Sequence, residues 1–193
     1  MRGVERVFYS DTSQEDFNTR KKEVLNFLYT KGKEEDLRKL SEFNKGEIDD
    51  GVRDIVNKLN ELPFLYTTLA CGGHKITRKS IKYPDAFSPR ENEASYRSGG
   101  IHFETNKSTE SQEFIKRLKK LVNQFEGATL YNRPFKTDQE EYQNLPYFAL
   151  GFGKTDKNNK NISISEAGDL EIEREEFKKE FKKLIKEFLQ PKE

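Results

Sequence analysis

Four side chains in this sequence have types and spacing suited to chemistry. Cys71 is the only cysteine, and two histidines are present, His74 and His102. Glu104 follows His102 at the spacing that puts both side chains on one face of a β-strand. Thiolates, imidazoles and carboxylates bind transition metals or transfer protons in catalysis. The candidate catalytic residues are therefore Cys71, His74, His102 and Glu104.

Two glycines separate the thiol from the first imidazole. Gly72 and Gly73 permit backbone angles that are closed to other residues, and they bring main-chain N–H groups close to an anion or a ligand. We therefore expect Cys71 and His74 to line a pocket together. We predict that side-chain atoms of at least two of Cys71, His74 and His102 lie within about 8 Å, the span of one bridging ion, water or small substrate.

Three interpretations of this group stay open. In the first, all four side chains ligate one metal such as zinc, although a Cys-x-x-His pair alone is a weak zinc signature because zinc usually has four ligands. In the second, they form an active site without a metal. In the third, they are structural: His102 and Glu104 form a polar pair on an exposed sheet face, and Cys71 is a half-buried apolar group.

Composition limits the partners and the compartment. Lysine and arginine number 35 against 34 aspartates and glutamates, so the net charge of +1 favours neither nucleic acid nor a membrane as a partner of the whole surface. A single cysteine forms no internal disulfide, and we see no signal sequence and no apolar run of membrane-spanning length. These features predict a cytoplasmic protein without membrane contact.

The stretch from residue 76 to residue 100 has the least regular pattern, because prolines, an asparagine and a glycine pair break every period. We predict a long loop there, with a short strand near Ile81. Cations neutralise phosphates, and aromatic rings stack on unpaired bases. This loop, together with Lys75 just before it, therefore predicts an RNA contact. The candidate RNA-binding residues are Lys75, Arg78 and Lys79. A solvated loop is the alternative, since acidic residues are interspersed.

Hydrophobic periodicity and capping residues predict the elements that position these groups. Helices are expected over residues 14–29, 33–43, 48–62, 108–127 and 172–189. Strands are expected over residues 64–70, 101–105, 128–135, 147–153 and 161–165, with a hairpin tip at 157–160. The order of elements predicts a single α+β domain over residues 1–193, with a mixed or mostly antiparallel sheet of about five strands flanked by helices.

Three segments, 17–22, 45–49 and 67–74, carry a resemblance to a known family. They read Phe-Asn-Thr-Arg-Lys-Lys, Lys-Gly-Glu-Ile-Asp and Thr-Thr-Leu-Ala-Cys-Gly-Gly-His, and they resemble the wybutosine-synthesis N-methyltransferase family that acts on phenylalanine tRNA. The resemblance covers roughly the first 75 residues. The turn differs from the family's pattern at Leu69, Ala70, Gly72 and His74.

The resemblance implies a methyl transfer that uses S-adenosylmethionine and a tRNA substrate. On that basis Thr67, Thr68, Gly72 and Gly73 are the expected cofactor-binding residues, and His74 or His102 is the expected proton acceptor. Two alternatives belong to other classes. One is a metal-binding or small-molecule-binding protein that uses the four candidate side chains, with zinc as the metal. The other is an interaction module without a catalytic site.

Overall fold

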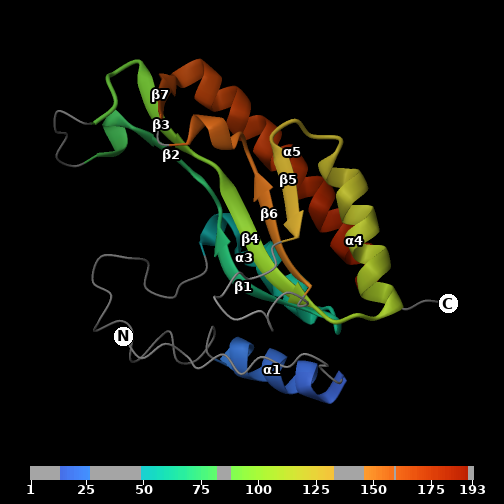
Figure 1. Ribbon diagram of the computed structural model, residues 1–193. Helices are drawn as coiled ribbons and strands as arrows, with labels where there is room; N and C mark the ends of the chain where they lie inside the picture. The colour runs from blue at the N-terminus through green and yellow to red at the C-terminus, as the bar shows by residue number, and fades with distance from the viewer. Residues whose placement is uncertain (1–13, 27–48, 82–87, 133–145, 159, 191–193) are drawn as a thin grey trace, which may run out of the picture.

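The computed structural model of the protein describes residues 14–26, 49–81, 88–132, 146–158 and 160–190 (Figure 1). The helices in these ranges are α1 (Gln14–Asn26), α3 (Asp50–Glu61), α4 (Thr109–Val122) and α5 (Ile164–Leu189). The strands are β1 (Leu65–Cys71), β2 (His74–Thr77), β3 (Glu93–Arg97), β4 (Gly99–Thr105), β5 (Ala128–Asn132), β6 (Tyr147–Phe152) and β7 (Lys160–Ser163). None of these helices combines the length and the apolar character needed to cross a bilayer.

The strands form two antiparallel sheets. One has the order β1-β4-β6-β5 and the other has the order β2-β3-β7. The predicted α+β class with antiparallel pairing is confirmed. The described residues hold seven strands in two sheets, however, and not one sheet of about five.

One long bent hairpin joins the two sheets. β1 runs into β2 through Gly72 and Gly73, and β3 runs into β4 through Ser98. Cys71 pairs with Gly100 on one side of this bend and His74 pairs with Arg97 on the other. The predicted loop over 76–100 is therefore wrong for its described part. β3 has no clear strand signal in the sequence, because its two buried residues are too few to establish a period of two.

The main core lies between the four-stranded sheet and the helices α3, α4 and α5. The sheet contributes apolar residues from β4 and β6, and the helices contribute a cluster of aromatic and aliphatic side chains, including Ile55, Leu59, Phe114, Phe177 and Phe181. Phe177 stacks on Phe181 at 5.9 Å between ring centroids. The regular apolar spacing of these helices predicted this buried face correctly.

Helix α1 covers part of the opposite face of the same sheet (Figure 1). Phe17 of α1 contacts Tyr66 of β1 at 5.4 Å between ring centroids. Tyr66 pairs with Glu104 and not with a core residue, so its side chain points away from α4 and α5.

Helix α5 packs against both sheets. Its second half, with Phe177, belongs to the main core, and its first half, with Ala167 and Leu170, packs on Tyr96 of the three-stranded sheet. The middle of α5 therefore lies against the bend where one sheet becomes the other.

Several predicted boundaries are wrong. The helix expected at 172 begins at Ile164, because Ser163 caps its first turn. The helix expected to close at Gly127 ends at Val122, and the strand expected to follow a hairpin tip at 157–160 pairs with β3. The expected helix 33–43 lies outside the described residues, as do the last residues of the expected helix 14–29 and strand 128–135.

Candidate metal centre

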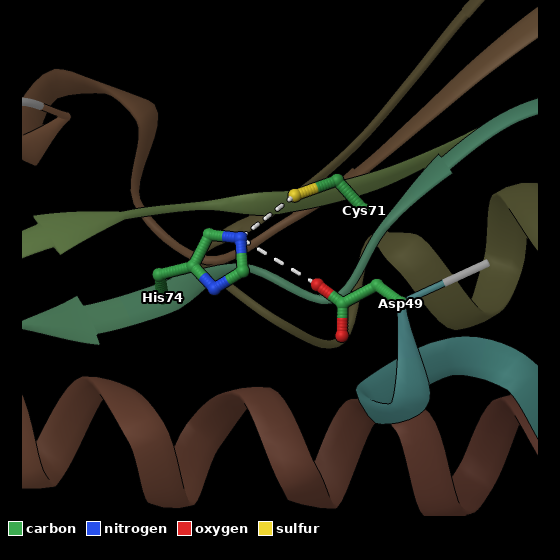
Figure 2. A group of neighbouring side chains, drawn as sticks. All are labelled: Asp49, Cys71 and His74. Carbon is green, nitrogen blue, oxygen red and sulfur yellow. Dashed lines mark hydrogen bonds and ion pairs between the residues drawn. The ribbon is translucent and has the colours of Figure 1, made fainter. Parts of the chain in front are cut away.

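Three side chains converge at the bend between the two sheets: Asp49, Cys71 and His74 (Figure 2). Cys71 Sγ lies 3.6 Å from His74 Nε2, and the same nitrogen lies 3.5 Å from Asp49 Oδ2. One ligand atom from each residue lies within 4.8 Å of the other two. The prediction that at least two of Cys71, His74 and His102 lie within about 8 Å is confirmed.

A β-bulge in β1 places Cys71 on the side of the sheet away from the core. Thr67 pairs with the core residue Phe103, but the register shifts before Leu69, which pairs with His102. A regular strand would keep residues 67, 69 and 71 on one face, so the shift turns Leu69 and Cys71 outward. Leu69 is accordingly 60% exposed, and Cys71 is a half-buried free thiol.

The backbone of Gly73 then brings His74 to the thiol. Residues three apart on a regular strand point to opposite faces. Gly73 has φ +78°, in the left-handed region that favours glycine, and it breaks the alternation between Cys71 and His74. A Cβ at this position would also lie 2.4 Å from Arg174 Nη1 and 2.7 Å from the Gly99 nitrogen. Both the conformation and the close approach therefore require glycine.

Asp49 joins the group through helix α3, for which it is the N-cap. Its Oδ1 accepts a hydrogen bond from the Gly51 N–H at 2.8 Å, and its Oδ2 accepts one from the Gly72 N–H at 3.0 Å. Partial burial raises the pKa of this carboxyl, but the two N–H donors and the charges of His74 and Lys178 outweigh that effect and hold the pKa below its ordinary value. Asp49 is therefore an anion at neutral pH.

The donor set fits a zinc-type ion. Zinc bonds of roughly 2.0–2.3 Å at tetrahedral angles separate neighbouring ligand atoms by about 3.3–3.7 Å. The two separations at His74 Nε2, 3.6 Å and 3.5 Å, match that range. The side chains of His74 and Asp49 are 44% and 23% exposed, so solvent reaches the group.

His102 and Glu104 are not part of this group, so the interpretation of all four side chains as one metal site is wrong. Cys71 pairs with Gly100 of β4, and His102 and Glu104 lie two and four residues further along that strand. At the rise of a strand, these offsets are roughly 7 Å and 13 Å. His102 Nδ1 is hydrogen-bonded to the Tyr147 hydroxyl at 2.8 Å, and the buried Glu104 accepts a hydrogen bond from the Tyr66 hydroxyl. The prediction that these two residues share one strand face is confirmed.

Two of the expected cofactor-binding residues, Thr67 and Gly72, make hydrogen bonds within the protein. Thr67 is buried, and its hydroxyl accepts a hydrogen bond from Asn60 at 3.0 Å. Thr68 occupies the bulge, where its hydroxyl oxygen is buried without a hydrogen-bond partner in the described part of the chain. The Gly72 N–H, expected to hold a ligand carboxylate or phosphate, donates to Asp49 instead.

The candidate RNA-binding residues lie shortly after His74 along the chain. Lys75 lies on β2, and Arg78 and Lys79 lie in the 3-10 turn η3 (Arg78–Ser80). Lys75 and Lys79 are exposed, and Arg78 Nη1 lies 3.5 Å from the Pro89 carbonyl oxygen, to which it donates. By sequence position, the three residues lie in β2 and in the turn after it. β2 leads away from the candidate metal centre into the arm that it forms with β3 (Figure 1).

Sequence reasoning missed Asp49 as a site residue. The acidic pair at the start of α3 predicts a favourable interaction with the helix dipole, and the capping role of Asp49 agrees with this. The sequence carries no sign that the second carboxylate oxygen meets Gly72, which is distant along the chain.

Comparison with known proteins leaves the family open. No protein-family model matches the chain, and no curated protein is significantly similar to it in sequence. Among solved structures, the chain is similar to the PH1069 protein from Pyrococcus horikoshii, with a TM-score of 0.43 and 16% identity. The alignment covers 91% of this chain and 93% of that one.

Proposed function

We propose that this protein binds zinc at Asp49, Cys71 and His74. The observation that carries the proposal is the convergence of a carboxylate, a thiol and an imidazole from three points of the chain. The imidazole nitrogen lies at separations from the other two groups that suit one tetrahedral ion. Sulfur together with nitrogen favours zinc over the oxygen-seeking ions magnesium and calcium.

Three protein ligands leave the fourth position of a tetrahedral zinc open. This count is typical of catalytic zinc sites, in which the fourth position holds water or a substrate. The N–H groups of Gly51 and Gly72 would orient the Asp49 carboxylate, as hydrogen-bonded neighbours do for metal ligands in other proteins. We place this chemistry in the cytoplasm, where a reducing environment keeps the thiol available, and cell fractionation tests that location.

Native mass spectrometry of the purified chain and titration with cobalt(II) test the metal. We expect one bound ion per chain and the absorption of a thiolate–cobalt bond. Cys71→Ala and His74→Ala should abolish both signals. His102→Ala is the matched control, because it removes the other histidine, which is bonded to Tyr147 and lies outside the group. A wild-type chain that binds neither zinc nor cobalt contradicts the proposal.

A second candidate function is methyl transfer from S-adenosylmethionine to tRNA. The observation that favours it is that two segments of the family resemblance, 45–49 and 67–74, meet through the hydrogen bond from the Gly72 N–H to Asp49. Residues from both segments would then form one pocket, with His74 as the proton acceptor.

Calorimetry with S-adenosylmethionine tests this candidate. The wild type should bind the cofactor, and Gly72→Val should abolish binding, because even a Cβ at residue 72 would lie 2.9 Å from Asp49 Oδ1. Gly168→Ala is the control, since open space surrounds residue 168. Absence of binding by the wild type removes the candidate.

A gel-shift titration with tRNA tests the RNA partner. Phosphate contacts release counterions, so Arg78→Ala with Lys79→Ala should flatten the salt dependence of binding by about one to two units. Lys119→Ala with Lys120→Ala, on the exposed face of α4, is the matched control and should leave the slope unchanged. Equal slopes for both double variants would exclude this RNA contact.

A further inference from the structure

A buried arginine supports the bend from the side of α5. Arg174 is 2% exposed, and its guanidinium forms an ion pair with Glu171. Nη1 donates to the Arg97 carbonyl oxygen at 3.4 Å, and the guanidinium carbon lies 5.9 Å from the centre of the Tyr96 ring. Arg174 therefore connects α5 with the strand that pairs with β2.

The same guanidinium lies directly against Gly73. Nη1 would be 2.4 Å from a Cβ placed on that residue, so it fills the space that the missing side chain leaves. Gly73 also has the left-handed backbone that turns His74 toward Cys71. The conformation that assembles the metal ligands is thus packed against Arg174.

One nitrogen of Arg174 has an unusual environment. Nε is buried and has no hydrogen-bond partner within the described residues. Burial of a guanidinium with an unpaired N–H costs free energy, whereas an apolar side chain of similar length would avoid that cost. The cost of the unpaired Nε offsets part of the stability that the other contacts of Arg174 supply. What an apolar side chain could not replace is the hydrogen bond that the planar guanidinium donates to the bend.

We infer that Arg174 is a positioning residue for the metal centre: it holds Gly73 in the left-handed conformation, and through it holds His74 beside Cys71. The inference rests on the proposed metal site. The contacts of Arg174 are with Glu171, the Arg97 carbonyl oxygen and the Tyr96 ring, and its Nη1 lies against Gly73. It therefore acts on the ligands through the backbone of the bend.

Electrostatics and positioning make opposite predictions for the removal of this residue. Loss of a positive charge near a cation site should tighten metal binding, whereas loss of a positioning residue should weaken it. Lys178, one turn along α5, provides the matched control. It is also a buried cation, its charge acts on Asp49, and its Nζ donates to Glu175 at 2.8 Å and not to the bend.

The test is cobalt(II) titration of wild type, Arg174→Met and Lys178→Met, with circular dichroism as the check of folding. We expect Arg174→Met to bind cobalt about tenfold or more weakly, with reduced thiolate–cobalt absorption, as seen for lost outer-shell partners of metals. Lys178→Met should bind as tightly as wild type or more tightly. Equal or tighter binding by a folded Arg174→Met overturns the inference.

A milder variant decides the question if Arg174→Met does not fold. Glu171→Ala removes the carboxylate that pairs with Arg174 Nη2 and leaves Arg174 in place. Because Glu171 is partly exposed, this substitution should disturb folding less than Arg174→Met. Weaker cobalt binding by this variant supports the positioning role, and unchanged binding overturns it. A wild-type chain without cobalt affinity overturns the metal proposal itself, and the inference falls with it.

Discussion

The two ends of the β1–β4 strand pair use polar side chains in different ways. At the bend, Asp49, Cys71 and His74 converge where solvent reaches them. At the end near α1, the buried Glu104 accepts a hydrogen bond from the Tyr66 hydroxyl, and a ring of α1 packs on Tyr66. The first end leaves ligand atoms available to an ion, whereas the second uses its polar atoms to hold the fold together.

This contrast shows why residue type alone does not define a site. A buried carboxylate with a hydrogen-bond partner is commonly structural, since an unpaired one would cost free energy. A half-exposed imidazole that lies beside a thiol and a carboxylate has donor atoms in reach of a ligand. We therefore expect substitutions at the α1 end to change stability and substitutions at the bend to change metal binding.

The largest effect should come from Gly73→Val, which affects both stability and metal binding at the bend. A side chain at φ +78° is strained, and the Gly99 nitrogen and the Arg97 oxygen would lie 2.7 Å and 2.9 Å from its Cβ. We expect the free energy of unfolding to fall by about 2–5 kcal/mol. Chemical denaturation measures it. Gly168→Ala in α5 is the control and should stabilise by about 0.5–1 kcal/mol. A Gly73→Val variant with the wild-type free energy of unfolding would contradict the close packing described for the bend.

Glu104→Ala tests the α1 end. The substitution removes the acceptor of the Tyr66 hydroxyl from a buried site, so we expect a loss of about 1–3 kcal/mol in the free energy of unfolding. Cobalt binding should stay at the wild-type level. Glu113→Ala is the matched control, because that glutamate is exposed and pairs with Lys116 within α4. Loss of cobalt binding by Glu104→Ala would mean that the two ends are one site.

His74→Ala is the reciprocal test at the bend. The side chain is 44% exposed, so we expect the free energy of unfolding to stay within about 0.5 kcal/mol of wild type while cobalt binding is lost. Denaturation and cobalt titration of the same preparation separate the two effects. A strongly destabilised variant that still binds cobalt would reverse the roles assigned to the two ends.

Lys21 of α1, which donates to the Leu62 carbonyl oxygen, should make a small, pH-dependent contribution to stability at the α1 end. Burial lowers the pKa of Lys21 from 10.5 to about 8. Between these values the unfolded chain binds more protons than the folded chain, so stability should rise as the pH increases from about 8 to 10. Because the group is only partly buried, we expect roughly 1 kcal/mol after solvent screening.

Denaturation of wild type and Lys21→Met over this pH range measures the effect as a difference between the two proteins. Lys22→Met is the control, because Lys22 is exposed on the same helix. A Lys21→Met variant whose pH dependence equals that of wild type would show that α1 does not bury this ammonium group.

The sequence by itself determined the local features of this protein. The apolar spacing of α3 and α4 predicted their buried faces, and Ser108 was recognised as the start of α4. These features depend on residues that are neighbours along the chain, through helical periodicity and capping. The residue types of the site were also evident, because the chain has one cysteine and two histidines.

Tertiary structure alone decided which of those residues meet. The bulge at Thr68 turns Cys71 out of the core, the left-handed Gly73 directs His74 to it, and the cap of α3 brings Asp49. His102 remains along β4 with Tyr147. A register shift of one residue moves a strand's side chains to the other face, and that register is set by contacts between residues far apart in the chain. Local sequence patterns therefore identified most of the residue types of the candidate site but not the set of residues that meets there.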